Sequence, residues 1–506
     1  MTRILITLGF LISGLTVACA AAEPLPTPLE AVTYSRISTS AEIADYLRAL
    51  AARHPETAKV DVLGKSAEGR ELVLLRLSKP APADAPSRPR VMIVGSQHGA
   101  AEPAGGEALL VIARELLEGK RRALLDDMDF LLLPNANPDG RDLGRRSNAN
   151  RVNLNIDFVK LTQPENRVLR EALYHYQPHA LLDSHESAVL KRQTLAKEGY
   201  LTDFNAQFEH SNNPAVPAAL RRYAREDFLP AINARVSEGG LPAHRYIGEI
   251  TRIGQPITHG GLTLRNFRNT TGMSGALAML VETKLDSKED PWPTYRNIKV
   301  RVERQLLCLH SFIDLVHERR ANLVPLVEAA RQALHREPLT LFAGYERDAA
   351  HPSIEIPMRR LDTRELEQVT FPDHRKQVDD QQIPFPPMIA ITRHMDAIRP
   401  VLERHGIRHW ELDEETGAEV IATRMKVPAN IVERAEVLAE TRKTLVLEPG
   451  SLLIDTAQLG GRVVPLLLEP RSTSSIFRYP EFAALVKPEE EFFVYRTYKG
   501  ATRSQP

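Results

Sequence analysis

Residues 90–119, "RVMIVGSQHGAAEPAGGEALLVIARELLEG", decide how this chain folds. The stretch opens with a near-continuous apolar run, which predicts a strand buried on both faces of a sheet, and it closes with apolar residues at helical spacing. His98 and Glu102 lie in the turn between the predicted strand and the predicted helix. The turn is therefore either an ordinary polar loop or the first half of a metal site.

Strands and helices alternate on both sides of this stretch. We expect strands within residues 59–78, 127–135, 179–185 and 276–283, and helices near 40–53, 165–176, 214–237 and 297–336. Such alternation is typical of an α/β fold. It predicts a mixed, mostly parallel twisted sheet with helices on both faces, within residues 23–338.

The length of the chain predicts more than one domain, because 506 residues exceed the size at which a single core usually stops growing. After about residue 338, proline-rich segments and short strand-like runs replace the alternation of strands and helices. We expect residues 339–506 to form a smaller, β-rich C-terminal domain, to which the sequence assigns no role. Within it, Pro449-Gly450 separates two apolar runs and predicts a β-hairpin.

Residues 1–22 have the pattern of a secretory signal peptide, with Arg3 before an apolar run and small residues before Glu23. The apolar run is too short to span a bilayer comfortably. We therefore expect the chain to be exported, either to the periplasm or into the medium. A lipid anchor at Cys19 fits the sequence less well, because Thr16 stands three residues before it.

Cysteine content and charge narrow the classes of protein further. Removal of the signal would leave Cys308 as the single cysteine, so we expect no disulfide framework and a small buried residue at this position. The 65 basic and 65 acidic side chains give a formal net charge of zero, which disfavours nucleic-acid binding. No later segment is long and apolar enough to predict a transmembrane helix.

Four polar side chains stand at the ends of three predicted strands. His98 and Glu102 follow the first strand, His185 ends the second, and Glu282 ends the third. These side chains could meet at one edge, because open α/β sheets bind ligands at the carboxyl ends of their strands. A lone histidine and glutamate in a loop are more often simply solvated, but two histidines and one glutamate form a known catalytic zinc ligand set.

Several ordered motifs resemble those of the M14-type zinc metallocarboxypeptidases. The likeness runs over about residues 34–312 and includes the opening "GKSAEGRELVLLRLS", the pair in "HGAAE" and the turn "NPDG". It continues with Arg146, which stands nine residues before Asn155, and with the two later strand ends described above. The resemblance implies the fold of a zinc carboxypeptidase and a hydrolytic activity.

The resemblance implies a metal centre. His98, Glu102 and His185 would bind one Zn²⁺ ion, and Glu282 would act as general base and then as general acid. The sequence departs from the family's His-x-x-Glu spacing, because one more residue separates His98 from Glu102. A bulged turn could absorb that residue if His98 ends the strand and the helix begins after Glu102; otherwise the ligand geometry fails.

The resemblance also implies contacts with the substrate. Arg146 would polarise the scissile carbonyl, and Asn155 would hold the terminal carboxylate. Ile156 stands where the family has a carboxylate-binding arginine, and an aliphatic side chain cannot replace a bidentate guanidinium. Either another arginine binds the carboxylate or the substrate lacks one. Arg265 and Arg268 are the candidates, unless they are solvent-facing charges of a loop.

Three further polar residues near these motifs are not expected to belong to the site. Glu107 lies in the apolar pattern of its helix, and we expect a surface residue rather than a substitute metal ligand. We expect His259 to be a loop residue and not a ligand. Tyr246 is the nearest tyrosine upstream of Glu282, and no role is assigned to it.

The sequence favours a zinc-dependent hydrolase of peptide or peptide-like amide bonds, most simply a carboxypeptidase that removes C-terminal residues. A related zinc N-acyl amino acid deacylase would keep the fold and the metal, although the long "NPDG" region and the second domain fit a peptidase better. A catalytically decayed peptide- or glycan-binding protein is the third reading. The two departures support it, whereas the joint presence of Arg146, Asn155, His185 and Glu282 speaks against it. A peptide-like substrate is the partner in the leading interpretation.

Overall fold

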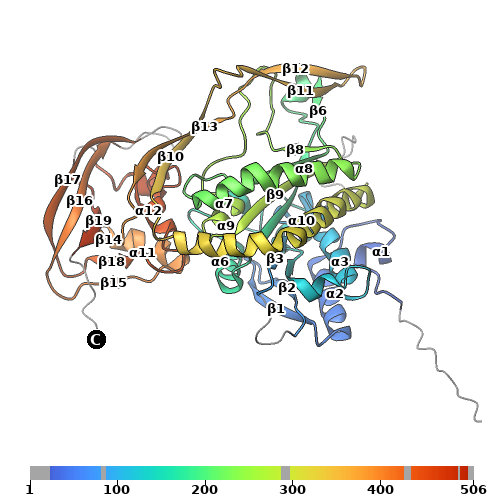
Figure 1. The fold of residues 1–506 in the computed structure, drawn as a ribbon, viewed down its shortest axis with the longest axis horizontal. Coiled ribbons are helices and arrows are strands. Elements are labelled where there is room, and N and C mark those ends of the chain that lie inside the picture. Colours follow the sequence, from blue (N-terminus) through green and yellow to red (C-terminus); the bar gives the residue numbers. More distant parts are fainter. Residues whose placement is uncertain (1–22, 81–86, 286–296, 427–434, 488–489, 500–506) are drawn as a thin grey trace, which may run out of the picture.

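A central eight-stranded sheet organises the N-terminal part of the chain (Figure 1). The computed structural model describes residues 23–80, 87–285, 297–426, 435–487 and 490–499, so the predicted signal peptide and Cys19 lie outside the described residues. The strand order in the sheet is β1-β2-β4-β3-β5-β9-β7-β8. These strands are β1 (Ala58–Lys65), β2 (Glu71–Leu77), β3 (Arg90–Val94), β4 (Asp129–Leu133), β5 (Ala180–Ala188), β7 (Ala206–His210), β8 (Ala243–Arg245) and β9 (Leu277–Leu285).

The centre of the sheet is parallel and is buried on both faces. Strands β4, β3, β5 and β9 pair in parallel, and antiparallel pairs join β2 to β4 and β7 to β9. Val91 and Ile93 of β3 belong to the main hydrophobic core, whereas Met92 and Val94 belong to the core on the opposite face. The predicted mixed, mostly parallel sheet is confirmed.

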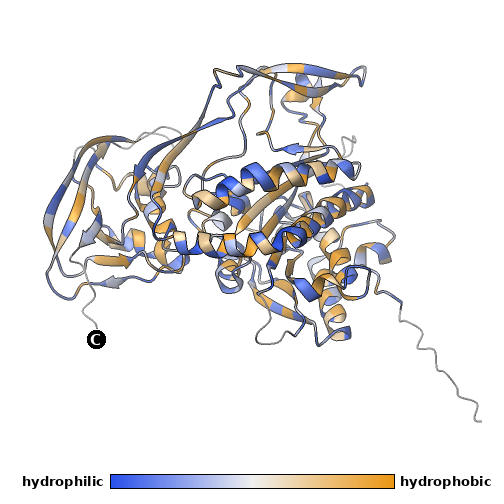
Figure 2. Ribbon diagram, viewed as in Figure 1, coloured by the Kyte–Doolittle hydropathy of each residue, from blue (hydrophilic) through white to orange (hydrophobic). Residues whose placement is uncertain are grey.

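Helices cover both faces of this sheet, as predicted. Helices α2 (Ser40–Arg53), α3 (Ala104–Leu117), α8 (Leu229–Glu238) and α10 (Ile298–Ala333) pack on one face, and α6 (Pro164–Tyr176) and α9 (Phe267–Gly272) pack on the other. Figure 2 shows the pattern that drives this packing: the central strands are largely hydrophobic, and α8 and α10 carry both hydrophobic and hydrophilic residues. Helix α7 (Ala218–Tyr223) leads into α8 through a π-helical turn, Ala224–Phe228.

Local signals explain where some elements begin. Helix α2 starts as predicted because the Thr39 hydroxyl accepts a hydrogen bond from the Glu42 amide, while the Glu42 carboxylate accepts one from the Thr39 amide. Cys308 is fully buried in α10, which confirms its prediction. Among the described residues, no helix combines the length and the hydropathy that crossing a membrane requires.

The chain from Leu339 onward is rich in strands. Strand β10 (Leu339–Glu346) pairs with β13 (Lys376–Ile383), and a six-stranded sheet follows in the order β15-β18-β14-β19-β16-β17. Its strands are β14 (Met388–Ile391), β15 (Trp410–Glu411), β16 (Thr416–Lys426), β17 (Glu436–Leu447), β18 (Leu452–Asp455) and β19 (Val494–Lys499), and helices α11 (Met395–Arg404), α12 (Val463–Leu468) and α13 (Pro480–Ala483) lie between them. The division of the chain at residue 338 stays a prediction.

One hairpin of this C-terminal region is built into the N-terminal part (Figure 1). Strands β11 (Ser353–Arg360) and β12 (Leu366–Pro372) form the hairpin, and β11 pairs antiparallel with β6 (Tyr200–Thr202). Ile257 adds an isolated bridge to Asp373. The two regions therefore share backbone hydrogen bonds as well as side-chain packing.

The predicted hairpin at Pro449-Gly450 is wrong. The residues do form a turn, with Gly450 at a φ of 84°, but β17 before it pairs with β16, whereas β18 after it pairs with β14 and β15. The reason lies in the hydrogen bonds of the turn. The Gly450 amide donates to the carbonyl of Leu412, and the Leu412 amide donates to the carbonyl of Ser451, so the turn pairs with the segment after β15 instead of folding β18 back onto β17.

Candidate active site

The turn that carries His98 accommodates its extra residue. Strand β3 ends at Val94, four residues before His98, and a short 3-10 turn (Gly99–Ala101) precedes Glu102 and α3. Gly99 has a φ of 54°, and a Cβ there would lie 2.5 Å from the carbonyl carbon of Gly140. The tight turn places His98 and Glu102 side by side, so the longer spacing does not separate them.

The "NPDG" turn fixes the loop that leads to His98. Asn137 caps helix α5 (Pro138–Asp142), and its side-chain amide donates to the carbonyl of Gln97 over 3.2 Å. Arg141 is buried and donates to the hydroxyl of Ser96 over 2.8 Å. These two hydrogen bonds, from Asn137 of the "NPDG" turn and from Arg141 directly after it, fix the position of the loop that leads to His98.

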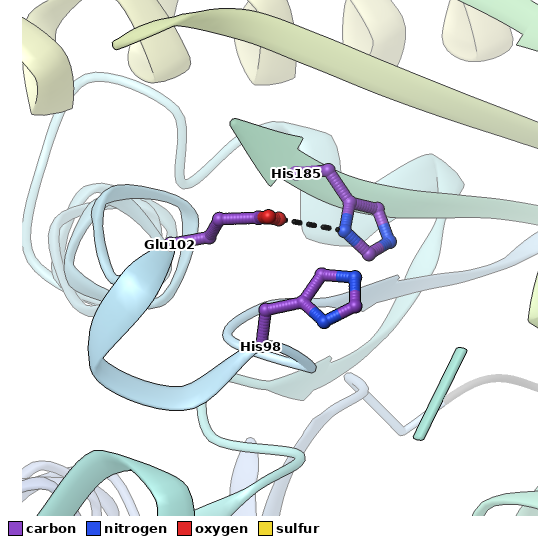
Figure 3. Close-up of side chains that lie close together, drawn as sticks. All are labelled: His98, Glu102 and His185. Carbon is purple, nitrogen blue, oxygen red and sulfur yellow. Dashed lines mark hydrogen bonds and ion pairs between the residues drawn. The ribbon is translucent and has the colours of Figure 1, made fainter. Parts of the chain in front are cut away.

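Three side chains predicted as metal ligands converge (Figure 3). His98, Glu102 and His185 each offer a donor atom that lies within 4.8 Å of the other two. Nδ1 of His185 donates to Oε2 of Glu102 over 2.9 Å, and the two imidazole centroids are 5.0 Å apart. All three residues are buried. The structure thus brings together the three residues that the sequence singles out, two from the loop after β3 and one from β5.

The donor set fits a divalent metal ion. Two imidazoles and one carboxylate are the ligands of a known class of catalytic zinc site. Nδ1 of His98 is buried and has no hydrogen-bond partner, whereas its Nε2 lies 3.1 Å from Arg146. A buried polar atom without a partner is costly, and a metal ion would satisfy it.

Asp183 lies behind His185 on the same strand. Residues i and i+2 of a strand share a face, and Oδ2 of Asp183 lies 2.9 Å from Nε2 of His185. A carboxylate in this position keeps a proton on Nε2 and leaves Nδ1 to act as ligand. Sequence reasoning missed Asp183, although the Asp-x-His spacing within a predicted strand could have identified it.

Glu282 lies next to His185 across the sheet. The two are register partners in the parallel pair of β5 and β9. Oε2 of Glu282 is shielded from solvent and has no hydrogen-bond partner among the described residues. Burial, together with the negative charge of Glu102, raises the pKa of Glu282 to about 8. A carboxyl group with a pKa near neutrality can both accept a proton and return it.

The three clustered side chains differ in protonation. Burial lowers the pKa of His98 to about 3, so this imidazole is neutral at pH 7. Burial opposes the charge of Glu102, but the charge of Arg146 and the hydrogen bond from His185 hold its pKa below the ordinary value. Burial also opposes the charge of His185, but Asp183 and Glu102 raise its pKa well above the ordinary value. Without a metal, His185 therefore holds a proton between two carboxylates.

Arg146 and Asn155 reach the rim of the same cluster. Nη1 of Arg146 contacts the carboxylate of Glu102, and half of the arginine side chain is exposed. Nδ2 of Asn155 lies 3.4 Å from Nε2 of His185. Both side chains are placed where they could contact a carbonyl or carboxylate that enters from solvent.

The backbone of Arg265 is held next to the turn that carries Ile156. The Phe158 amide donates to the carbonyl of Arg265 over 3.2 Å, and the Phe267 amide donates to Oδ1 of Asn155 over 3.0 Å. Ile156 itself is 44% exposed. Nε of Arg265 is buried and has no hydrogen-bond partner among the described residues.

Arg268, the other candidate for binding the terminal carboxylate, is not a solvent-facing charge. It is buried, and its Nη2 donates to Oδ1 of Asn212 over 3.0 Å and to the carbonyl of Gly261 over 3.2 Å. His259 is buried as well and bonds through Nδ1 to the carbonyl of Tyr246 over 2.8 Å, outside the metal-ligand cluster. The contacts of Arg268 hold its side chain inside the protein, against Asn212 and Gly261.

The prediction that Glu107 is a surface residue is wrong. Glu107 is 1% exposed and forms a buried ion pair with Arg141 at 2.9 Å. Its carboxylate also accepts hydrogen bonds from the amide and the hydroxyl of Ser38. The physical reason is that the guanidinium of Arg141, in α5, is buried next to Glu107 and needs a counter-charge.

Helix α10 supports the site from the other face of the sheet. Arg301 forms a buried ion pair with Glu186 at 2.7 Å, and Glu186 accepts a hydrogen bond from the Ala104 amide at the start of α3. Gln305 donates to the carbonyl of His185 over 2.8 Å. Sequence reasoning missed these residues, because polar groups inside a long amphipathic helix give no local signal of their partners.

Comparisons with known proteins agree with the motifs. Residues 43–208 match the family model Peptidase_M14, described as zinc carboxypeptidase. The chain is 29% identical over 246 residues to carboxypeptidase 2 of Trichophyton rubrum, which covers 47% of this chain and 45% of that protein. It is 35% identical over 125 residues to carboxypeptidase E of Caenorhabditis elegans, which covers 21% of this chain and 26% of that protein.

Among solved structures, a metallo-carboxypeptidase from Burkholderia cenocepacia aligns with a TM-score of 0.41 and 22% sequence identity, over 57% of this chain and 71% of that chain. The resemblance to zinc carboxypeptidases that the sequence motifs indicate is confirmed by the family match. The chain spans less than half the length of the fungal relative it matches.

Proposed function

We propose that this chain, whose residues 43–208 match the zinc carboxypeptidase family, is a metallocarboxypeptidase that hydrolyses the C-terminal bond of a peptide or a peptide-like amide. The observation that carries the proposal is the convergence of His98, Glu102 and His185, with Glu282 next to His185 across the sheet. Such a set combines the ligands of a metal with a carboxylate that can move a proton.

His98, Glu102 and His185 would hold one Zn²⁺ ion. When bound, Zn²⁺ would supply a Lewis acid for the scissile carbonyl and would lower the pKa of a water molecule to about 7. His185 would give up the proton on Nδ1, and Asp183 would keep the proton on Nε2.

Glu282 would carry the proton through the reaction. Its carboxylate would take a proton from the attacking water and would later give it to the leaving amine nitrogen, so that water and an amide become a carboxylic acid and an amine. Its pKa of about 8 belongs to the metal-free protein, and a cation beside it would lower that value.

Arg146 and Asn155 would contact the substrate. Negative charge develops on the carbonyl oxygen during the attack, and the half-exposed guanidinium of Arg146 could stabilise it. Asn155 would hold the terminal carboxylate together with Arg265, whose backbone is pinned to the same turn. Arg265 would thus supply the guanidinium that Ile156 lacks.

We also propose that the chain is exported, because residues 1–22 have the pattern of a signal peptide. Its substrates would then be peptides outside the cytoplasm. The division into a catalytic domain over 23–338 and a β-rich domain over 339–506 belongs to the same proposal.

Zinc content and substrate selectivity test the proposal in one experiment. The purified chain, Glu282→Gln and the control Glu318→Gln are loaded with zinc, and each is assayed on peptides with a free or an amidated C-terminus. We expect one zinc per chain in all three proteins. The wild type should cleave only the peptides with a free C-terminus. Glu282→Gln should lower kcat by roughly 10²–10⁴-fold. Glu318 lies on the exposed side of α10 and pairs with Arg235, so its variant should match the wild type.

The same measurements would identify the alternatives. Hydrolysis of small N-acyl amino acids without cleavage of peptides would indicate a deacylase. A chain that binds no zinc under zinc-replete conditions would contradict the proposal and would favour a decayed binding protein.

A further inference from the structure

A pocket lies beside Glu282 at the carboxyl end of the sheet. It is lined by residues of three different regions. The lining residues include Ser187 of β5 and Gln207 of β7, the loop 246–250, and Ile356 and Pro357 of the C-terminal hairpin.

The pocket opens onto the same face of the sheet as the proposed active site. His185 and Ser187 share a face of β5, because they are two residues apart. Glu282 is the register partner of His185 on one side and of Gln207 on the other. Cross-strand partners point to the same face, so His185, Glu282 and Gln207 form one row that leads from the metal-ligand cluster to the pocket.

The apolar wall of the pocket depends on the C-terminal hairpin. Ile356 packs with Ile250 and Ile257 in one hydrophobic cluster, which joins the hairpin to the loop that follows β8. The pairing of β11 with β6 holds the hairpin in this position. Ile356, Pro357, Ile250, Phe204 and Tyr246 give the pocket its apolar lining.

The charged groups of the pocket are already paired. Lys191 pairs with Glu249 at 2.7 Å, and Asp203 pairs with Arg359 at 2.6 Å. A charged ligand group would have to displace one of these partners, whereas an uncharged one would not. The lining therefore favours an uncharged occupant.

One polar group of the pocket has no partner. Thr202 is 6% exposed, and its hydroxyl makes no hydrogen bond among the described residues. A ligand that carries a peptide group could satisfy this hydroxyl, because a peptide offers both a donor and an acceptor.

The position of the pocket gives the direction of a bound peptide. Asn155, which would hold the terminal carboxylate, contacts His185, whereas the pocket begins at Gln207 on the other side of Glu282. A peptide that places its terminus at Asn155 and its scissile bond at Glu282 therefore continues toward the pocket.

We propose that this pocket binds an uncharged, apolar side chain of the residue on the acyl side of the scissile bond, and that Ile356 and Pro357 make the C-terminal region part of substrate selection. The inference rests on the proposed carboxypeptidase function. A Leu or Phe side chain at the penultimate position would fill the pocket, and its peptide group would bond to Thr202.

A pair of peptides tests this inference. Both have the same free C-terminal residue, and the penultimate residue is Leu in one and Ala in the other; the ratio of their kcat/KM values is measured on the same sample. We expect the wild type to favour Leu by roughly 10-fold or more, as for other apolar pockets. Because the ratio does not depend on the folded fraction, it remains valid for a destabilised variant.

Variants on one strand provide the matched comparison. Ile356→Ala should lower the Leu-over-Ala ratio at least several-fold, and Ile247→Trp, which fills the pocket from the loop, should do the same. Ile354→Ala lies on the same strand and packs against the same cluster without lining the pocket, so its ratio should stay within twofold of the wild type. Equal ratios in all four proteins would overturn the inference. Failure to cleave either peptide would instead contradict the proposed function.

Discussion

The carboxylate of Asp183 lies 2.9 Å from Nε2 of His185, two residues further along β5. A carboxylate behind a ligating imidazole typically improves metal affinity 10–100-fold. We therefore expect Asp183→Asn to weaken zinc binding by roughly 10-fold or more in a chelator competition assay. Asp373→Asn is the control, because Asp373 is also buried but pairs with Arg375, remote from the cluster. Equal zinc affinity in the two variants would contradict this role.

Zinc should stabilise the folded chain. A ligand that binds the folded state at 100 times its Kd adds about 2.7 kcal/mol to the free energy of unfolding. Addition of EDTA to the zinc-loaded protein should therefore lower Tm, and zinc should restore it. His98→Ala removes one proposed ligand, and its Tm should respond to neither addition. A Tm of the wild type that ignores zinc would count against the metal centre.

Loss of the buried Glu107 carboxylate should destabilise the fold. Removing one partner of a buried ion pair leaves the other charge without compensation, which typically costs about 3–5 kcal/mol. We expect that decrease in the free energy of unfolding for Glu107→Ala in urea denaturation. Glu115→Ala on the same helix is the matched control, because Glu115 pairs with His310 at a half-buried position. A surface role for Glu107 would make the two variants alike.

Arg265 should affect substrate binding more than turnover. If its guanidinium binds the terminal carboxylate, Arg265→Met should raise KM by about 30-fold, equivalent to ~2 kcal/mol, for peptides with a free C-terminus. The exposed Arg252 lies in the same long connection, and Arg252→Met should leave KM unchanged. An unchanged KM in Arg265→Met would remove Arg265 from the site.

Acid should weaken the folded state partly through His405. Burial lowers the pKa of His405 to about 3, while its Nε2 bonds to the carbonyl of Val159 at 2.9 Å. The unfolded chain takes up this proton near pH 6.5, so the contribution is complete above pH 6.5 and is lost as the pH falls toward 3.

Between these pH values each unit of acidification should cost about 1.4 kcal/mol for this one group. Urea denaturation at pH 7 and pH 5 should therefore show a smaller acid loss for His405→Asn than for the wild type. The exposed His351 serves as control, and His351→Asn should lose as much as the wild type. Parallel losses in all three proteins would refute the assignment.

Sequence patterns predicted the N-terminal fold well because each element there carries a local signal. Helix α2 has its capping box, and the strands of the sheet centre are long apolar runs. The prediction of a hairpin at Pro449-Gly450 is wrong because the turn forms hydrogen bonds with Leu412, which is distant in the sequence, and β18 therefore does not pair with β17. Local composition predicts a turn, but it does not predict what the turn pairs with.

In the candidate site, too, features with a local sequence signal could be predicted, and features that depend on distant residues could not. His98 and Glu102 follow β3, and His185 and Glu282 lie near the carboxyl ends of β5 and β9 in the same sheet, so topology alone predicts that they converge. Glu107 was misjudged because its counter-charge comes from another segment of the chain. The pocket could not be predicted at all, since its wall is completed by a hairpin that no motif connects to the site.

The pairing of β6 with β11 has a consequence for biosynthesis. About 150 residues separate the two strands, and at ~5–20 residues per second the ribosome needs roughly 8–30 s to make those residues. During that interval β6 has no β11 to pair with, and Ile250 and Ile257 are not yet covered by the apolar residues of the hairpin. At this stage the nascent chain exposes both an unpaired strand edge and a hydrophobic surface. We therefore expect a chaperone that binds such intermediates to bind this one.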